Sequence, residues 1–381
     1  MAGPRLVVRH PFQLRAAPGR ARAFELPGGV HNATPSRLVF GAGALAELPR
    51  LVGELGGRRA LIVSTPGRRG LADRAAALLG DRCAGILPEA VSQVPIETAI
   101  RGRELFRASG ADVLVSIGGG ASVGLGKAIA LETATPVIAV PTTYSGSEMT
   151  GFCGITIDGV KRMHTSLNML ASCVIYDPEL SLTLPVEVSA ASAFNALAHC
   201  VDVVYVPTAA PAMLAAAYEG AAVIADALPR VVRDPSDLDA RADLLYGGML
   251  AGAALTGGYA LQHGLAHTLG GSFGVPHGHS HAVVLPHVAA YNARFAPEPL
   301  ARMASALGVA DLAPALFDLL VVSGLPTSLR DFGLDEGIVE RTVAITVETD
   351  NGLNPGPMTP EDLRAIVMDA LDGRRPGGAP A

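Results

Sequence analysis

The chain combines histidine and asparagine at spacings that could hold a metal ion or move a proton. The candidates are Asn195, His199, His263, His267, His277 and His281. The members of the first two pairs are four residues apart, so each pair shares one face if its segment is helical. Three histidines with one oxygen donor form a ligand set that divalent iron or zinc prefers. One such pair is more often ordinary helix surface, but seven histidines between residues 199 and 287 predict a functional cluster.

A glycine-rich turn in the first half predicts a phosphate site. The segment VLVSIGGGASVGLGK has the pattern of a buried strand, then Gly118, Gly119 and Gly120, then a helix that begins near Ser122. Glycine lets the backbone approach a phosphate closely, and the helix N-terminus offers free N–H groups and a positive dipole end. Lys127, further along the helix, could add a positive charge. A plain structural turn is the alternative interpretation.

A second polar turn follows the next apolar run, in PVIAVPTTYSGSEMT. It carries hydroxyl groups at Thr142, Thr143 and Ser147. If both apolar runs are strands of one parallel sheet, the two turns lie at its carboxyl edge, where open α/β sheets bind ligands. The glycine turn lacks the GxGxxG pattern with an acidic residue about 20 positions later, so a dinucleotide would be held differently here. A polar loop with satisfied caps is the alternative.

The sequence around the turns and the sequence around the histidines predict two different kinds of domain. From about residue 35 to 185, β-branched runs alternate with alanine-rich and leucine-rich stretches, which predicts an α/β domain with a parallel, Rossmann-like sheet. After about residue 186 the strand pattern disappears, which predicts an all-α domain. The expected organisation is a flexible extension at 1–31, a nucleotide-binding α/β domain at 32–185, a helical domain with the histidine site at 186–373 and a tail at 374–381.

Composition and charge exclude several classes of protein. The 381 residues are 49% hydrophobic and 17% charged, with a net charge of −6 and scattered Lys and Arg. This pattern does not fit a nucleic-acid-binding or anionic-lipid-binding surface, and no run reaches the ~18 apolar residues of a membrane span. Four cysteines without CxxC spacing indicate reduced thiols. We therefore expect a cytoplasmic protein whose partner is a small molecule.

The order of the motifs gives a more specific indication. GGG-x-S, PTT-x-x-GSE, N-x-x-x-H, H-x-x-x-H-x-LG and PHG follow one another between about residues 32 and 372. In this order they resemble the iron-containing alcohol dehydrogenase family, and TTYSGSEMT, FNALAH and HTLGGSF are most similar to its maleylacetate reductase branch. The resemblance implies a dehydroquinate-synthase-like fold, with NADH or NADPH on the glycine turn and the active site between the domains. It also implies a homodimer formed through an N-terminal strand.

The resemblance assigns catalytic and metal-binding roles to individual residues. Metal-dependent members hold their ion with an aspartate and three histidines, whose positions match Asn195, His199, His263 and His277 here. An amide oxygen is a weaker partner for a hard cation than a carboxylate, so divalent iron or zinc could bind but we do not expect it to be required. His267 is the first candidate for a proton relay, acting as a histidinium. The other catalytic candidates are His199, His263, His277 and His281.

The resemblance also assigns the cofactor site. The cofactor-binding candidates are Thr65, Gly118, Gly119, Gly120, Ser122, Lys127, Thr142, Thr143, Ser147 and Lys161. Ser64 and Thr65 stand where many relatives have an aspartate that contacts the ribose, and Arg68 and Arg69 are close by. This arrangement permits NADPH as well as NADH. The alternative is that both arginines are solvated loop charges.

The implied reaction is the NAD(P)H-dependent reduction of an oxo-acid such as maleylacetate, with histidine-assisted protonation, as part of aromatic catabolism. Two departures bear on the substrate. Gly264 and Gly356 stand where maleylacetate reductases commonly have a lysine and an arginine, which could bind carboxylates. A metal-dependent alcohol or aldehyde dehydrogenase, or a carbonyl reductase with a less charged substrate, is therefore the first alternative. A non-redox lyase or synthase of the dehydroquinate synthase type is the second.

Overall fold

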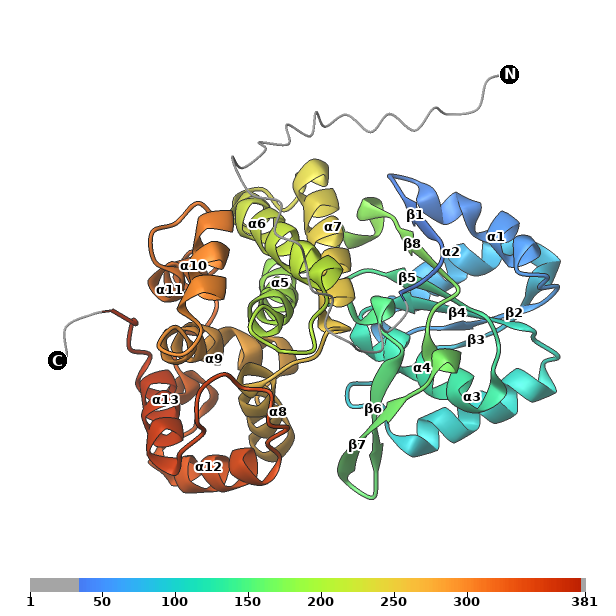
Figure 1. Ribbon diagram of the computed structural model, residues 1–381. Coiled ribbons are helices and arrows are strands. Elements are labelled where there is room, and N and C mark those ends of the chain that lie inside the picture. Colours follow the sequence, from blue (N-terminus) through green and yellow to red (C-terminus); the bar gives the residue numbers. More distant parts are fainter. Residues whose placement is uncertain (1–33, 378–381) are drawn as a thin grey trace.

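The computed structural model describes residues 34–377 and has two lobes (Figure 1). The first lobe contains all the strands of this part of the chain, and the second is built from helices. The elements thus confirm the expected fold class, a parallel α/β region followed by an all-α region. The extension expected at 1–31 and the end of the expected tail lie outside the described residues.

Six strands form one parallel sheet in the order β1-β8-β5-β4-β2-β3. They are β1 (Leu38–Phe40), β2 (Ala60–Val63), β3 (Cys83–Leu87), β4 (Val113–Gly118), β5 (Val137–Pro141) and β8 (Cys173–Tyr176). Two further strands, β6 (Phe152–Ile157) and β7 (Val160–Thr165), pair with each other as an antiparallel hairpin. Because the six strands are parallel, all their carboxyl ends meet at one edge of the sheet.

Helices cover both faces of this sheet. They are α1 (Leu48–Glu54), α2 (Arg69–Leu79), α3 (Ile96–Ala108) and α4 (Gly120–Thr133). Ala60 and Ile62 of β2 pack with α1 and α2 on one face, whereas Leu61 and Val63 pack with α3 and α4 on the other. A strand covered on both faces needs apolar residues at every position, which is why continuous apolar runs encode these strands.

Nine α-helices form the described part of the second lobe. They are α5 (Val186–Val203), α6 (Pro211–Arg233), α7 (Leu238–Leu255), α8 (Leu261–Phe273), α9 (His277–Asn292), α10 (Pro297–Ala306), α11 (Leu312–Val322), α12 (Val339–Glu348) and α13 (Pro360–Asp372). α9 lies at the centre of the lobe, in contact with α5, α8, α11 and α13. Its first residue is His277, one of the candidate metal ligands and catalytic residues.

One of these helices, α6, is long and apolar enough to cross a membrane by length and composition alone. It packs against α7 and α5 (Figure 1), and Ala217, Ala221 and Ile224 are buried there. Its apolar residues therefore have partners within the helical lobe.

The loop between β5 and β6 joins the lobes by close backbone contact with α7. A Cβ on Gly252 would lie 2.0 Å from the carbonyl oxygen of Gly146, and a Cβ on Gly248 would lie 2.4 Å from that of Tyr144. The buried guanidinium of Arg241, also on α7, donates to the Tyr144 hydroxyl at 2.9 Å. The absence of side chains at Gly248 and Gly252 allows this close approach, and the hydrogen bond from Arg241 fixes the loop against the helical lobe.

Candidate active site

The glycine turn lies at the carboxyl end of β4. α4 begins at Gly120, two residues earlier than expected, and Gly119 is its N-cap. Gly118 has a φ of 137°, which favours glycine, and a Cβ on Gly119 would lie 2.9 Å from Thr143 Cγ2. The buried Ser122 hydroxyl has no hydrogen-bond partner within residues 34–377. A helix N-terminus thus lies beside an unpaired donor, an arrangement suited to a phosphate.

The loops after β5 and β2 lie beside the glycine turn, because β5 and β2 flank β4 in the sheet. The backbone N–H of Thr142 donates to the carbonyl of Gly118 at 3.0 Å. The hydroxyls of Thr142 and Ser64 are buried and also lack partners in the described part of the chain. Thr65 occupies the N-cap position of the short helix that follows β2, without a side-chain capping hydrogen bond. The structure therefore brings these cofactor candidates to one edge of the sheet.

Lys127 has a different position from the one expected. It is buried, and its ammonium donates to the carbonyl oxygens of Ser147 and Phe152 and to Thr150 Oγ1. Burial lowers the pKa of Lys127 to about 8. Since these three bonds use all three N–H donors, no donor remains for a phosphate. We correct the expected charge contact: Lys127 instead ties α4 to the segment that leads into the β6–β7 hairpin.

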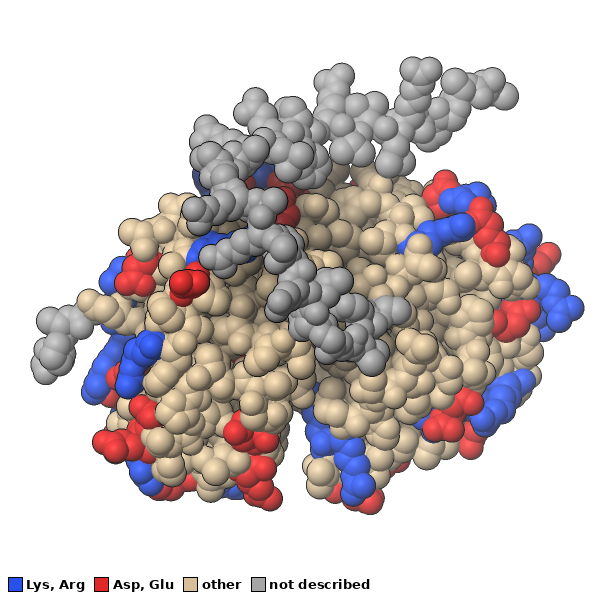
Figure 2. Space-filling view, viewed as in Figure 1, with Lys and Arg blue, Asp and Glu red and all other residues tan. Residues whose placement is uncertain are grey.

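The hairpin places Lys161 beside the cleft between the lobes. Its stem lies across Gly154, where a Cβ would be 2.2 Å from Lys161 Cε. The ammonium has no hydrogen bond or ion pair with any residue that the structure describes. Burial lowers the pKa of His267 and His277, and the charge of Lys161 contributes to both shifts, so the hairpin and the helical lobe face each other. Figure 2 shows the surface hollowed between them at its lower edge.

Five histidines form one cluster where α5, α8 and α9 meet. The rings of His199 and His263 stack with centroids 5.1 Å apart, and His281 lies 4.8 Å from His263. His277 is 4.7 Å from His281, and His267 is 5.9 Å from both His263 and His277. The structure therefore brings all five catalytic candidates together. The α9 helix explains part of this, since His277 and His281 are one turn apart on it.

Several polar atoms of this cluster are buried without a partner. Asn195 Oδ1, His199 Nδ1, His263 Nε2 and both ring nitrogens of His281 have no hydrogen bond to any residue between 34 and 377. Unpaired buried polar atoms are costly and rare in native proteins. Their concentration at one place indicates that the cluster receives a ligand.

The surroundings of His199, His267, His277 and His281 favour the neutral imidazole. Burial lowers the pKa of His199, His267 and His281 well below the ordinary value, and the neighbouring histidines contribute. Burial also lowers the pKa of His277 to about 3. The histidinium form expected for His267 is therefore not the resting form of the ligand-free site.

Two overlapping sets of donors in the cluster are candidate ligands for a divalent transition metal. One is the set implied by the resemblance, Asn195, His199, His263 and His277. The other is His267, His277 and His281, whose ligand atoms all lie within 4.8 Å of one another. Both sets consist of neutral donors, so neither supplies a negative charge directly to the ion. The residues can hold iron or zinc, with a weaker affinity than a set that contains a carboxylate.

Asp202, one turn after His199 on α5, was not among the candidates. It is fully buried, its Oδ2 accepts a hydrogen bond from the backbone N–H of Ala260 at 2.7 Å, and the same oxygen lies 2.7 Å from His263 Nδ1. Its Oδ1 accepts from the Tyr205 hydroxyl at 2.6 Å. The spacing H-x-x-D could have revealed this residue, because positions i and i+3 of a helix lie on one face.

His279 lies outside the cluster although the sequence places it among its members. Its Nε2 is 3.2 Å from Oε1 of Glu187, and its ring packs edge-on against Phe332. His279 is therefore available as a control for substitutions within the cluster.

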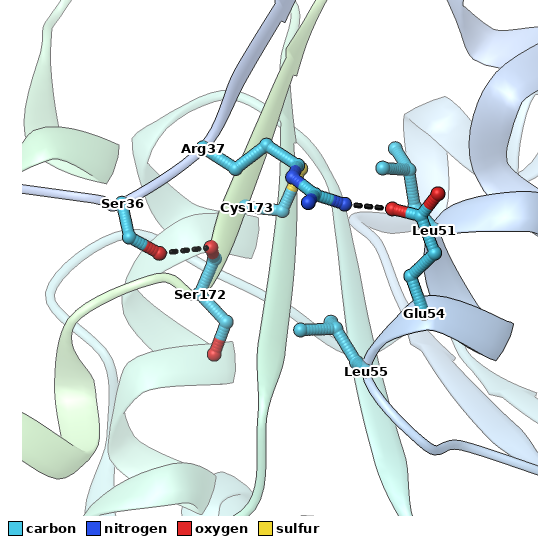
Figure 3. Close-up of a pocket in the computed structure, with 7 residues that line it drawn as sticks. All are labelled: Ser36, Arg37, Leu51, Glu54, Leu55, Ser172 and Cys173. Carbon is cyan, nitrogen blue, oxygen red and sulfur yellow. Dashed lines mark hydrogen bonds and ion pairs between the residues drawn. The ribbon is translucent and has the colours of Figure 1, made fainter.

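A pocket of about 340 Å³ at the opposite edge of the sheet is not part of this site (Figure 3). It is lined by Ser36 and Arg37, which precede β1, and by Ser172 and Cys173 at the start of β8. Arg37 pairs with Glu54, and the Ser36 hydroxyl donates to the carbonyl of Ser172. These groups bind one another, unlike the unpaired groups of the nucleotide loops and the histidine cluster.

Comparison with known proteins extends over both lobes. The model of the iron-containing alcohol dehydrogenase family matches residues 35–178, and that of the C-terminal part of the Fe-containing alcohol dehydrogenase family matches residues 189–371. The chain belongs to the iron-containing alcohol dehydrogenase family. This membership confirms the expected family and the expectation of an oxidoreductase.

Relatives within the iron-containing alcohol dehydrogenase family narrow the comparison. A maleylacetate reductase of Burkholderia cepacia is 44% identical over 341 residues, which cover 89% of this chain and 97% of the relative. The crystal structure of maleylacetate reductase from Agrobacterium tumefaciens has 40% identity and a TM-score of 0.87, covering 91% of this chain and 99% of that one. An iron-containing alcohol dehydrogenase from Corynebacterium glutamicum has 37% identity and a TM-score of 0.87, with 91% and 97% coverage. The expected maleylacetate reductase branch is confirmed.

His287 of α9 lies outside the cluster and gives a prediction about pH. Burial lowers its pKa to about 4 in the folded protein, and its Nε2 has no partner among the described residues. The unfolded chain binds this proton near pH 6.5, so its contribution to stability is present above that pH and is lost as the pH falls through about 4. At ~1.4 kcal/mol per pKa unit, the loss is on the order of 3 kcal/mol.

We expect His287→Leu to flatten the fall in stability between pH 6.5 and 4. The measurement is the unfolding midpoint of the wild type and the variant over this pH range. A variant that loses stability on acidification as steeply as the wild type would show that other groups cause the fall.

Proposed function

We propose that the chain is an NAD(P)H-dependent reductase of maleylacetate or a closely related oxo-acid. The observation that carries the proposal is the cluster of five histidines, which lies close to Lys161 of the hairpin, together with the unpaired buried groups of the loops suited to a nucleotide. The 44% identity to a maleylacetate reductase, over nearly the full length of that enzyme, supports the same substrate class.

Reduction of maleylacetate adds a hydride and a proton to neighbouring carbons. Maleylacetate has a carbon–carbon double bond conjugated to a ketone, with a carboxylate at each end. When bound, the nicotinamide cofactor supplies a hydride to the alkene carbon remote from the ketone. The electron pair of the double bond then moves toward the ketone oxygen as an enolate. Protonation at the carbon next to the ketone gives the saturated oxo-acid, so one reduced cofactor and one proton are consumed.

His267 is proposed to relay that proton from solvent: one ring nitrogen gives up its N–H proton while the other ring nitrogen takes one, so the imidazole stays neutral. Its ring is half-buried at the cleft and lies against His263, His277 and His281. A neutral imidazole can donate a hydrogen bond from its N–H to the developing oxyanion. A donor that is fixed in a site of low dielectric stabilises that charge strongly. The other histidines are proposed to orient His267 and to exclude water.

Lys161 is proposed to bind an anion in the cleft. Its unpaired ammonium faces the histidines and could contact either the cofactor's phosphates or a carboxylate of the substrate. A carboxylate contact would compensate for the absence of cations at Gly264 and Gly356.

The cofactor is proposed to lie on the glycine turn, Ser122, Thr142, Thr143 and Thr65, with the loop around Ser147 at its side. Arg69 is paired with Asp73, whereas Arg68 donates to Thr183 and could turn toward a 2′-phosphate. We therefore propose that either NADPH or NADH can serve as the cofactor. We also propose that no metal is required, because the matching ligand position is the neutral Asn195.

The test measures oxidation of NADH and of NADPH with maleylacetate and, in parallel, with a neutral aldehyde. The enzyme is treated with chelator, its residual metal is measured, and Fe²⁺ or Zn²⁺ is returned to half of it. We expect oxidation with maleylacetate that does not depend on metal. Activity only with metal, or only with the aldehyde, would favour the metal-dependent dehydrogenase. Substrate consumption without cofactor oxidation would favour a lyase or synthase.

A further inference from the structure

The histidine cluster contacts a buried carboxylate, Asp202, which has no role in the proposed reaction described above. Asp202 on α5 reaches the start of α8, the helix that carries His263, and Figure 1 shows these two helices in the same part of the second lobe. Its two oxygens accept from one side-chain hydroxyl and from the backbone N–H groups of Ala260 and His263, and one of them also contacts His263 Nδ1. With no exposed surface, Asp202 can be satisfied only by these neighbours.

The partners of Asp202 decide the direction of its bond to His263. The Ala260 N–H can only donate to Oδ2, and the Tyr205 O–H donates to Oδ1. Burial and the Asp202 charge raise the pKa of Tyr205, so its hydroxyl keeps the proton that it donates. Both carboxylate oxygens therefore act as acceptors. The hydrogen of the 2.7 Å contact with His263 then belongs to Nδ1.

In the neutral form of an imidazole, a proton on Nδ1 leaves Nε2 with a lone pair. Nε2 of His263 is buried and lacks a protein partner in the described chain. The rings of His199 and His281 lie 5.1 and 4.8 Å away, between centroids. In the opposite tautomer, Nε2 would be a donor and Nδ1 would oppose the carboxylate with a lone pair.

We propose that Asp202 is a positioning residue that fixes His263 as the Nδ1–H tautomer and aims its Nε2 lone pair into the histidine cluster. Nε2 of His263, which has no partner among residues 34–377, is then an acceptor for a group that enters the cluster, and the ring that His267 contacts edge-on has a fixed orientation. The effect on turnover rests on the proposed reductase function, whereas the tautomer does not. Outer partners of functional histidines commonly change activity or metal affinity by about 10-fold to 100-fold when replaced.

The first test reads the tautomer directly. Long-range ¹H–¹⁵N spectra of the ¹⁵N-histidine-labelled full chain distinguish a protonated from an unprotonated ring nitrogen, and the His263→Gln spectrum identifies the His263 signals. We expect Nδ1 protonated and Nε2 unprotonated in the wild type, with or without turnover. The opposite tautomer in the wild type would overturn the proposal, even if Asp202→Asn fails to fold.

The second test separates positioning from structure. An amide at position 202 presents N–H groups on one side, so it cannot accept from every present donor, and we expect Asp202→Asn to shift the tautomer and lower kcat by about 10-fold to 100-fold. Its affinity for the cofactor should stay within about twofold. Asp177→Asn is the matched control, because Asp177 is also buried and bonds backbone N–H groups away from the cluster. It should lower stability without changing the tautomer. An unchanged tautomer and kcat in folded Asp202→Asn would refute the role.

Discussion

Replacing His267 with asparagine is expected to lower kcat by about a thousandfold, because general acid–base groups contribute ~10²- to 10⁴-fold. His267 is the cluster member at the half-buried face of the cleft, in contact with three other histidine rings. Asparagine can still donate a hydrogen bond but cannot transfer a proton. The measurement is kcat with maleylacetate, together with the dissociation constant of the reduced cofactor, which should not change.

His279→Asn is the control for this substitution. It removes a histidine from the same PHGHSH segment, but its ring bonds Glu187 outside the cluster. We expect its kcat to remain within about twofold of the wild type. Equal losses in the two variants would mean that the segment is sensitive to any change, and a normal kcat in His267→Asn would move the proton relay to another histidine.

Replacing Gly252 with alanine is expected to destabilise the protein by about 3 kcal/mol, the upper part of the usual range for overpacking. The added Cβ would lie 2.0 Å from the Gly146 carbonyl oxygen. Because the atoms that it would meet belong to the backbone, no side chain can rotate away to make room. The helix propensity of alanine would offset only about 1 kcal/mol. The displaced loop carries Thr142 and Thr143, so affinity for the cofactor should fall as well. Thermal unfolding and cofactor titration measure the two effects.

Gly271→Ala is the matched control. Gly271 is also a helical glycine, on α8, but a Cβ there would meet nothing within 4 Å. We expect it to leave cofactor affinity unchanged and to stabilise slightly. If Gly252→Ala behaved in the same way, the loop would not be held by its contact with α7.

The sheet could be predicted from the sequence where strands are buried on both faces. Continuous apolar runs identify β2, β4, β5 and β8, whose residues are all buried. The strand β3 was missed because CAGIL lies at the edge, has alanine and glycine at its centre and is only half-buried. The β6–β7 hairpin was missed although Asp158 and Gly159, both with positive φ, form a typical hairpin turn.

The site could be predicted in its residue types but not in its electrostatics. Helical spacing is enough to group the histidines, because α5, α8 and α9 each present residues one turn apart. The neutral resting state of His267 depends on burial by several helices, which no local pattern encodes. The same holds for Lys127, whose partners lie between 20 and 25 residues further along the chain. Asp202 shares a face of α5 with His199, but its contact with His263 is seen only when α8 docks beside α5.

The surroundings of the two lysines give the protein a built-in chemical handle. Lys127 and Lys161 are the only lysines of the sequence. One is enclosed with all its N–H groups bonded, whereas the other is exposed on β7, with a pKa lowered because nearby protein atoms remove part of its water. Acylating dyes react with the deprotonated amine, so apart from the chain's amino terminus they should mark the hairpin alone. A fluorophore attached there would report entry of the cofactor into the cleft without any engineered cysteine.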